Sequence, residues 1–450
     1  MINRLVNAIM LVVLLPGMSM SGQLIQGSDM TYLGAFRVPQ GNYNGQSYGY
    51  GGYGLAYNPT NNSLFTTGLL GRAMAEFEVA VPDTSSNIES LNVGTNLQGF
   101  YDIWEGNFNN IGEDGAECLG NGNIAGGLML YNGLLYGTVW AYYDGAYCAQ
   151  LSHYTTGLDL SVPGDFDGYY RVGDTSYNVG IRAYYMCEIP TEWQASFGGA
   201  NALTGRCFDP ILGRTSFGPS ISTFYPDSLG VVEPSPSTVL LWYASSGDMA
   251  TLGNYQDGHD GGGGSPNPYI SPADNVSGVV FAEGTDTVLF IGSHGAGEWC
   301  YKCEVPNNPA GNGAYPYVYF AWAYDANDLA AVYQGDYEVT QNDYDTSRFL
   351  EGNWPNNTVL AVGDTVRPWN VVPYDVWELE TSIFPSPEQI NIPRVRGGTF
   401  DPIENRVYFT AYGADGVNDK PLIHVFDLDT GDAPPSSISA PDTLAAGRTP

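Results

Sequence analysis

The sequence predicts an all-β protein, a β-propeller of about six blades (five to seven) with long surface loops. Three observations support this fold class. Helical periodicity is nearly absent, and the 58 glycines and 33 tyrosines fall among short β-rich runs bounded by Asn, Asp, Gly and Pro. One unit also recurs, in which a glycine-led strand, a turn and an aromatic-rich strand follow one another. A small antiparallel sheet cannot bury both faces alone, whereas sheets stacked around an axis can.

The repeat is clearest in four places, each followed by a third strand. The four copies are Gly54–Gly68, Gly127–Trp140, Gly278–Gly292 and Gly398–Gly413, and the third strands are expected at Ala73–Val81, Leu151–Thr156, Tyr317–Asp325 and Leu422–Asp429. The leading glycines lie 73, 151 and 120 residues apart, so the last two intervals are about twice the length of one unit. Each of these two intervals is expected to hold one divergent copy, near Val179–Pro190 and Ser237–Ser246 in the first and around Tyr374–Glu380 in the second. A β-sandwich array and a β-helix remain the alternatives.

The two ends of the chain differ from its middle. A charged start, the apolar run Leu5–Met18 and small residues up to Gly22 predict a secretory signal peptide over residues 1–22. The propeller domain is expected over residues 23–430, and residues 431–450 have the composition of a flexible C-terminal linker. No later stretch has the roughly 18 apolar residues that a membrane helix needs. We therefore expect a secreted protein, extracellular or periplasmic, without membrane insertion.

Charge and cysteine content narrow the environment and the partners. The formal net charge is -33, from 48 acidic and 15 basic residues. Nucleic acid and anionic membranes are disfavoured as partners, because both require a basic patch. Six cysteines in an exported chain predict disulfides. Of the 15 connectivities, proximity favours three pairs: Cys118–Cys148, Cys187–Cys207 and Cys300–Cys303.

Three segments resemble exported bacterial propeller-like proteins of unknown function. They are YLGAFRVP (Tyr32–Pro39), the unit Gly278–Cys300 with its HGAG, and AYPYVYFAWAYDANDLAAV (Ala314–Val332). The repeats, with HVFDLDTGD near the end, are also loosely similar to NHL and kelch repeats. The resemblance implies one continuous propeller domain and brings no catalytic residues.

In NHL-type propellers the glycine-led strand is innermost, which implies that the loops before the first strand and after the second strand of each blade converge on one face. A propeller's ligand site is normally the mouth of its channel. Aromatic rings beside short polar groups suit sugar rings, although tyrosines also fill the space between blades. The residues expected to bind a ligand there are Arg72, Tyr142, Tyr143, Asp144, Trp299 and Tyr301.

Four residues are candidates for chemistry. In GSHGAGEWCYKC (Gly292–Cys303), His294 would be a general base and Glu298 its partner. Arg394 and Arg396 alternate along one strand and would clamp a carboxylate, or else pair with surplus acids. The same stretch carries Cys-x-x-Cys, for which a zinc site and a redox pair are the alternatives to a disulfide-pinned turn on the rim.

These patterns favour a secreted propeller that binds carbohydrate or another extracellular polymer through its loop face. One alternative is a polysaccharide-degrading enzyme, a lyase or a glycoside hydrolase, with a His/Arg/Tyr site. The other is a structural or adhesive module of the cell surface. No cofactor is firmly implied. The acidic turns Asp427–Asp432 and Asp257–Asp260 would suit a structural calcium ion, but turns of this composition also form without metal.

Overall fold

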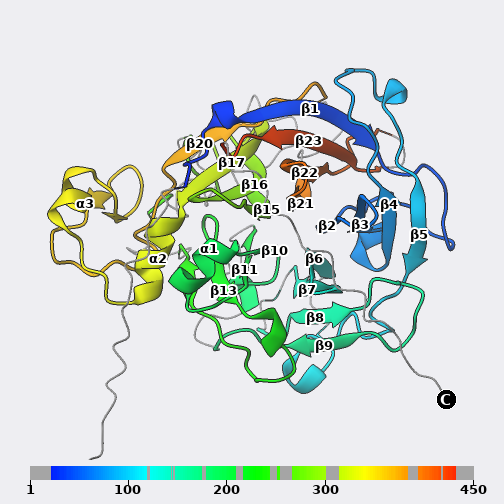
Figure 1. Cartoon of the computed structure of the whole chain (residues 1–450), viewed down its shortest axis with the longest axis horizontal. Helices are drawn as coiled ribbons and strands as arrows, with labels where there is room; N and C mark the ends of the chain where they lie inside the picture. Colours follow the sequence, from blue (N-terminus) through cyan, green and yellow to red (C-terminus); the bar gives the residue numbers. More distant parts are fainter. Residues whose placement is uncertain are drawn as a thin grey trace, which may run out of the picture.

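Five antiparallel blades form a ring in the computed structural model of the chain (Figure 1). The structure describes residues 22–118, 122–142, 144, 147–174, 179–208, 216–243, 251–253, 266–299, 314–383, 394–416 and 419–431. Each blade has four main strands, and the first strand of each blade along the chain lies at the axis.

The blades follow one another around the ring in chain order. Blades 1 and 2 consist of β2 (Leu55–Asn58), β3 (Ser63–Thr67), β4 (Met74–Glu78) and β5 (Asn96–Tyr101), then β6 (Asn123–Tyr131), β7 (Leu134–Ala141), β8 (His153–Thr156) and β9 (Asp167–Tyr170). Blades 3 and 4 consist of β10 (Tyr185–Glu188), β11 (Ala202–Gly205), β13 (Ile221–Phe224) and β14 (Val239–Leu241), then β15 (Asn275–Phe281), β16 (Thr287–Gly295), β17 (Tyr317–Asp325) and β20 (Asp375–Glu378), with β12 (Cys207–Phe208) beside β15. Blade 5 consists of β21 (Val395–Asp401), β22 (Arg406–Ala411), β23 (Leu422–Leu428) and β1 (Met30–Arg37).

The ring is closed by pairing of the two ends of the described chain. The N-terminal strand β1 lies antiparallel to β23 and so completes blade 5 from outside (Figure 1). A buried ion pair reinforces the join, because the Arg37 guanidinium lies 3.0 Å from the Asp415 carboxylate. Lys420 Nζ donates a hydrogen bond of 2.9 Å to the carbonyl oxygen of Gln40. Residues almost 400 positions apart in the sequence are thereby held together.

The hydrophobic core is divided among the spaces between blades. Each pair of neighbouring blades encloses one cluster of buried apolar residues. On β2, Ala56 packs toward blade 2, whereas Leu55 and Tyr57 pack toward blade 5. This alternation follows from the two-residue period of a strand, which sends successive side chains to opposite faces. Every blade therefore depends on both of its neighbours for burial.

Glycine allows the inner strands to approach one another at the axis. A methyl group added to Gly126 would lie 2.3 Å from the carbonyl oxygen of Ala183 on the next blade. One added to Gly278 would lie 2.8 Å from the Cα of Gly398. The recurring glycine of the sequence is thus the residue that lets blades pack backbone against backbone.

The β6–β7 hairpin shows how local sequence sets the register within a blade. Tyr131 pairs with Leu134, and Asn132 and Gly133 form the two-residue turn between them with φ of 48° and 78°. Asn-Gly is the strongest signal for a turn of this type, because both positions need a positive φ.

Helices occupy the connections rather than the blades. The α-helices are α1 (Thr191–Gln194), α2 (Ala326–Gln334) and α3 (Gln341–Asp345), and the short strands β18 (Leu350–Glu351) and β19 (Thr358–Val359) lie in the same β17–β20 insertion as α2 and α3. The 3₁₀ helices are η1 (Gly27–Asp29), η2 (Leu69–Gly71), η3 (Ile88–Ser90), η4 (Glu113–Gly115), η5 (Val179–Ile181), η6 (Ala195–Phe197) and η8 (Pro226–Ser228). Among the described residues, no helix is long and apolar enough to cross a bilayer.

The predicted fold class is confirmed, and the four recognised repeats are blades 1, 2, 4 and 5. The blade number is five, within the expected range but one fewer than the central estimate. The segments near Val179–Pro190 and Ser237–Ser246 contain β10 and β14 of blade 3, so the first long interval holds one further blade, as expected. The segment Tyr374–Glu380 contains β20, the outer strand of blade 4. Residues 1–21 and 432–450 lie outside the described residues, so the signal peptide and the tail stay predictions.

The axial contact predicts an unequal response to two glycine substitutions. Gly126→Ala should lower the free energy of unfolding by more than about 2 kcal/mol, because the new methyl group meets backbone of blade 3. Gly133→Ala is the matched control: it has open space around it, so only its positive φ opposes the change, at about 1 kcal/mol. Denaturant unfolding of both variants measures the difference. Equal losses would contradict a close axial contact.

Candidate functional site

The inner strands all begin at one end of the ring, and we call this end the channel mouth. Hydrogen bonds link the first residues of neighbouring inner strands there. Asn275 Nδ2 donates to the carbonyl oxygen of Val395 over 3.1 Å, and the Gly54 amide donates to the carbonyl oxygen of Arg396, also over 3.1 Å. Second strands run back toward the same end, so the residues that end them lie beside these starts.

Arg396 lies between two aromatic rings at the mouth. Its guanidinium carbon is 4.0 Å from the ring centre of Tyr53 and 3.9 Å from that of Tyr412. Tyr53 precedes β2 and Tyr412 follows β22, so blades 1 and 5 each supply one ring. The preceding Val395 is buried in the apolar cluster between blades 4 and 5, which fixes the strand that carries Arg396.

The charge of Arg396 is not neutralised by the described part of the protein. It makes no ion pair with any described carboxylate, and its buried Nε has no hydrogen-bond partner. Burial lowers the pKa of Arg396 to about 10, with the Tyr412 hydroxyl opposing this shift. The guanidinium stays protonated at neutral pH and keeps donors available. A group of this kind can accept a carboxylate with charge-assisted hydrogen bonds.

Blades 2 and 3 bring a second aromatic–cation group to the mouth. The guanidinium of Arg206 lies 4.3 Å from the ring centre of Trp140, and the Trp140 and Tyr184 rings meet edge to face at 5.2 Å. Burial raises the pKa of Tyr184, while hydrogen bonds from Ser277 and Asn275 and the charges of Arg394 and Arg206 act in the opposite direction. Arg394 therefore lies near the tyrosine of blade 3, across from its own blade.

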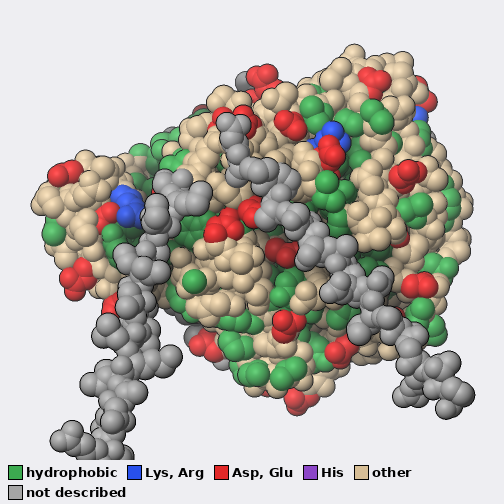
Figure 2. All heavy atoms as spheres, viewed as in Figure 1, with side chains coloured by type: hydrophobic (Ala, Val, Ile, Leu, Met, Phe, Trp, Pro, Cys, Tyr) green, Lys and Arg blue, Asp and Glu red, His purple; other side chains and the backbone are tan. Residues whose placement is uncertain are grey.

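The mouth contrasts with the rest of the surface. Acidic side chains are spread over the face drawn in Figure 2, where Lys and Arg side chains are few. The mouth instead gathers Arg206, Arg394 and Arg396 with Tyr53, Trp140 and Tyr184. The described part of the mouth is therefore suited to an anionic group attached to a flat or ring-shaped molecule.

The predicted position of His294 on a rim loop is wrong, while its role as a general base stays a prediction. His294 is part of strand β16 and only 3% exposed, with its ring packed on Phe320 at 4.6 Å. Its Nδ1 lies 2.7 Å from Oδ2 of Asp274, and Oδ1 of the same carboxylate accepts the amide of Gly295 over 2.7 Å. This pair ties the end of β16 to the start of β15.

Glu298 is not the partner of His294. It is exposed, whereas Trp299 next to it is buried with an indole nitrogen that has no partner among the described residues. Cys300, Tyr301 and Cys303 lie outside the described residues, so their pairing and the role of Tyr301 stay predictions.

The residues predicted after β3 and β7 lie at the same end of the ring as Arg396. Arg72 is exposed after η2, and Tyr142 is 39% exposed with its ring 6.1 Å from that of Trp140. Asp144 is 9% exposed and accepts the amides of Cys148 and Ala149, so it shapes the turn. Tyr143 lies outside the described residues.

The cysteine predictions have two different outcomes. The pair Cys118–Cys148 forms a disulfide with its Cα atoms 5.7 Å apart, which joins the loop before β6 to the loop after β7. The pair Cys187–Cys207 does not form, and both thiols are free. The reason is topological: Cys187 is on β10 of blade 3, whereas β12 with Cys207 leaves that blade and pairs with β15 of blade 4.

Metal binding has no clear support among the described residues. One group that could hold an ion is Cys118, Asp144 and Cys148. Its sulfurs are joined to each other, and the Asp144 oxygens accept backbone amides, so these contacts account for the cluster without an ion. The segment Asp257–Asp260 and residue Asp432 lie outside the described residues, and structural calcium stays a prediction.

The sequence did not reveal the group on blades 2 and 3. Arg206, Trp140 and Tyr184 were not predicted, because the strands of blade 3 were expected only as a divergent copy and its loops were not placed at the mouth. Just before its inner strand, the residue that meets Gly126 at the axis is Ala183 rather than a glycine. The aromatic pair Tyr184 and Tyr185 just before a short strand was the remaining signal.

No protein-family model matches the chain, and no curated protein matches it. Among solved structures, the chain is similar to an exo-1,5-α-L-arabinanase from a bovine ruminal metagenomic library, with 12% identity, a TM-score of 0.38 and coverage of 84% of this chain and 93% of that one. It is also similar to an arabinanase of Bacillus subtilis, with 12% identity, a TM-score of 0.37 and coverage of 88% and 96%. A third is a structure of the GH130 mannoside phosphorylase family, with 11% identity, a TM-score of 0.39 and coverage of 90% and 98%. Likeness at this level says nothing of substrate, and the five-bladed ring follows from this chain's own strand order.

The two classes of cysteine predict different reactivity. After denaturation without reductant, iodoacetamide should modify Cys187 and Cys207 but not Cys118 and Cys148. In the native protein Cys207 should stay unmodified at pH 8, because burial raises its pKa to about 12 and only 3% of it is exposed. Peptide mapping by mass spectrometry reads out both results. A cross-linked peptide containing Cys187 and Cys207 would contradict the topology.

Proposed function

We propose that the protein is exported and binds an acidic carbohydrate, a polysaccharide with carboxylate-bearing sugar residues, at the channel mouth. The observation that carries this proposal is Arg396, a half-buried guanidinium between the rings of Tyr53 and Tyr412 that no carboxylate of the described residues reaches. Buried arginines are normally paired with acids. The 48 acids of the chain supply many candidates, yet none of the described ones reaches it.

The surroundings of Arg396 fit a sugar ring better than a small anion. Rings line two sides of the guanidinium, and a second aromatic group lies at blades 2 and 3. Flat rings contact the C–H faces of sugars, while the hydroxyl of Tyr184 and the arginine donors suit sugar oxygens. The Cys118–Cys148 disulfide also supports an oxidising, extracytoplasmic compartment.

The net charge limits which acidic polymers are suitable. A protein of charge -33 repels a densely charged polyanion at long range. A polymer with widely spaced carboxylates, or a short oligosaccharide with few of them, avoids most of this repulsion. We therefore expect uronic acid residues separated by neutral ones.

An enzyme that cleaves such a polymer is the second candidate. Tyr184 is the residue that such an enzyme would use: burial raises the pKa of its hydroxyl, and the charges of Arg394 and Arg206 act against that shift. In lyase chemistry a base removes the proton beside a neutralised carboxylate, a C=C bond forms, the glycosidic C–O bond breaks, and the departing sugar oxygen takes a proton from the protonated base or from water. His294, the predicted base, is buried against Asp274.

Substitution of Arg396 tests the binding proposal. Arg396→Gln should weaken the binding of a partially methyl-esterified polygalacturonate oligosaccharide at least 10-fold, because one charge-assisted bidentate contact contributes more than about 1.4 kcal/mol. Arg406→Gln is the control: it removes an arginine of the same blade at the far end of β22, where Arg406 lies 3.6 Å from Glu404. Isothermal titration measures both variants.

A second control in the same titration changes the ligand instead of the protein. A carboxyl-reduced form of the oligosaccharide should bind the wild-type protein as weakly as the acidic form binds Arg396→Gln. Equal affinity of wild type and Arg396→Gln for the acidic form would exclude Arg396 from the site.

Turnover separates the two candidates. An eliminating enzyme would release products with a C=C bond, followed as ultraviolet absorbance, and Tyr184→Phe should abolish this signal while leaving affinity within about 3-fold. If the protein only binds, absorbance stays flat for wild type and variant alike. Turnover that survives in Tyr184→Phe would remove Tyr184 from the chemistry.

A further inference from the structure

We propose that a second carbohydrate site, for a neutral sugar, lies on the outside of the ring at the end opposite the channel mouth. It is a cleft of about 510 Å³ between the β10–β11 connection of blade 3 and helix α2 of blade 4. We call it the side cleft. Its size falls within the range of roughly 300–1,000 Å³ typical of small-molecule sites. Strand β17 runs away from the mouth before α2 begins, which places the cleft at the far end.

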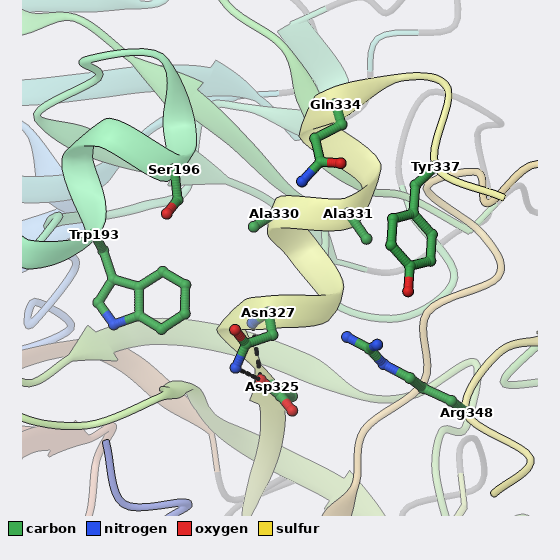
Figure 3. Close-up of a pocket in the computed structure, with 9 residues that line it drawn as sticks. All are labelled: Trp193, Ser196, Asp325, Asn327, Ala330, Ala331, Gln334, Tyr337 and Arg348. Carbon is green, nitrogen blue, oxygen red and sulfur yellow. Dashed lines mark hydrogen bonds between the residues drawn. The ribbon is translucent and has the colours of Figure 1, made fainter. Parts of the chain in front are cut away.

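The side cleft has aromatic walls and a flat floor. Figure 3 shows Trp193 on one side, α2 with Ala330 and Ala331 in the middle, and Tyr337 on the other side. Both rings are partly exposed. Ala330 and Ala331 are buried, so α2 presents only small side chains between the two rings. Two rings that flank a floor of small residues suit the C–H faces of a pyranose.

The polar groups of the side cleft are largely uncharged. The side chains of Ser196 and Gln334 are exposed and make no hydrogen bond to any described residue. The Asp325 carboxylate accepts two hydrogen bonds from Asn327 through Oδ1. A hydroxyl, an amide and one carboxylate are groups that bind sugar hydroxyls.

Arg348, the one cation among the described residues that line the side cleft, is already neutralised. Its guanidinium contacts the Asp328 carboxylate and lies 3.0 Å from that of Asp343. An acidic sugar would therefore meet no free positive charge here, in contrast to the mouth. The lining thus selects a neutral sugar rather than a uronate.

The walls are fixed before any ligand binds. The Trp193 indole donates to the carbonyl oxygen of Thr285 over 3.0 Å, and its ring packs against Phe281 at 5.7 Å. The Tyr337 hydroxyl donates to Asp343 over 3.0 Å. Little side-chain freedom is lost on binding, so even a small contact area gives measurable affinity.

Titration with neutral oligosaccharides tests the site. The probes are hexasaccharides built from glucose, mannose, galactose and xylose, each titrated by saturation-transfer NMR against the full-length protein. At least one should bind. Gln334→Ala should weaken that binding about 3-fold or more and Trp193→Ala about 10-fold or more, whereas Gln341→Ala, an exposed glutamine on α3 outside the cleft, should leave it unchanged.

Two further results decide the outcome. Arg396→Gln should leave neutral-sugar binding unchanged, which separates the side cleft from the channel mouth whatever happens to acidic ligands. Because Trp193→Ala also removes packing, its thermal unfolding is recorded, and Gln334→Ala carries the result if that variant is unstable. The proposal is overturned if no hexasaccharide binds, if Gln334→Ala binds as wild type does, or if Arg396→Gln abolishes binding.

Discussion

The backbone contact between inner strands at the axis is the constraint on which the rest of the structure depends. Gly54, Gly126, Gly278 and Gly398 have no side chain to hold neighbouring blades apart. Only because the inner strands come this close can five blades close into a ring with one apolar cluster between each pair. The join of β1 to β23 then holds the ring shut. Because each apolar cluster is shared by two blades, loss of one blade would expose the cores of both of its neighbours.

The closed ring gives the site its chemistry. Residues from distant parts of the chain meet at the mouth, since every inner strand begins there. Arg396 is placed between rings of two blades, and water is partly removed from it. Removing water from a guanidinium is unfavourable, and the two aromatic faces offset part of that cost. The result is a cation that still lacks an anionic partner among the described residues.

The sequence predicted the features of the fold that depend on short local patterns, such as the glycine-led strands and the tight turns. Four blades were recognisable because each begins with a glycine strand and continues through a turn such as Asn132–Gly133. Blade 3 was expected only as a divergent copy, since Ala183 lies at the axis where Gly126 of blade 2 has no side chain. The interval between the inner strands of blades 4 and 5 contains helices α2 and α3 instead of another blade. The expectation that Arg394 and Arg396 lie at the mouth came from the strand order of NHL-type propellers, and strand alternation added only that both point one way.

Contacts between distant residues were the part that could not be predicted. His294 has Glu298 as its neighbour in sequence, but the paired strands β15 and β16 bring Asp274 to it instead. Likewise, Cys187 and Cys207 are only 20 residues apart, yet the chain changes blade between them. Proximity along the chain is a weak guide where each strand pairs with a partner chosen by the whole ring.

The most direct test is a crystal structure of the protein soaked with a digalacturonate. The account predicts that one sugar carboxylate lies within hydrogen-bonding distance of the Arg396 guanidinium, with Tyr53 and Tyr412 on either side. An acidic side chain of the protein itself bound to that guanidinium, with the sugar absent from the mouth, would contradict it.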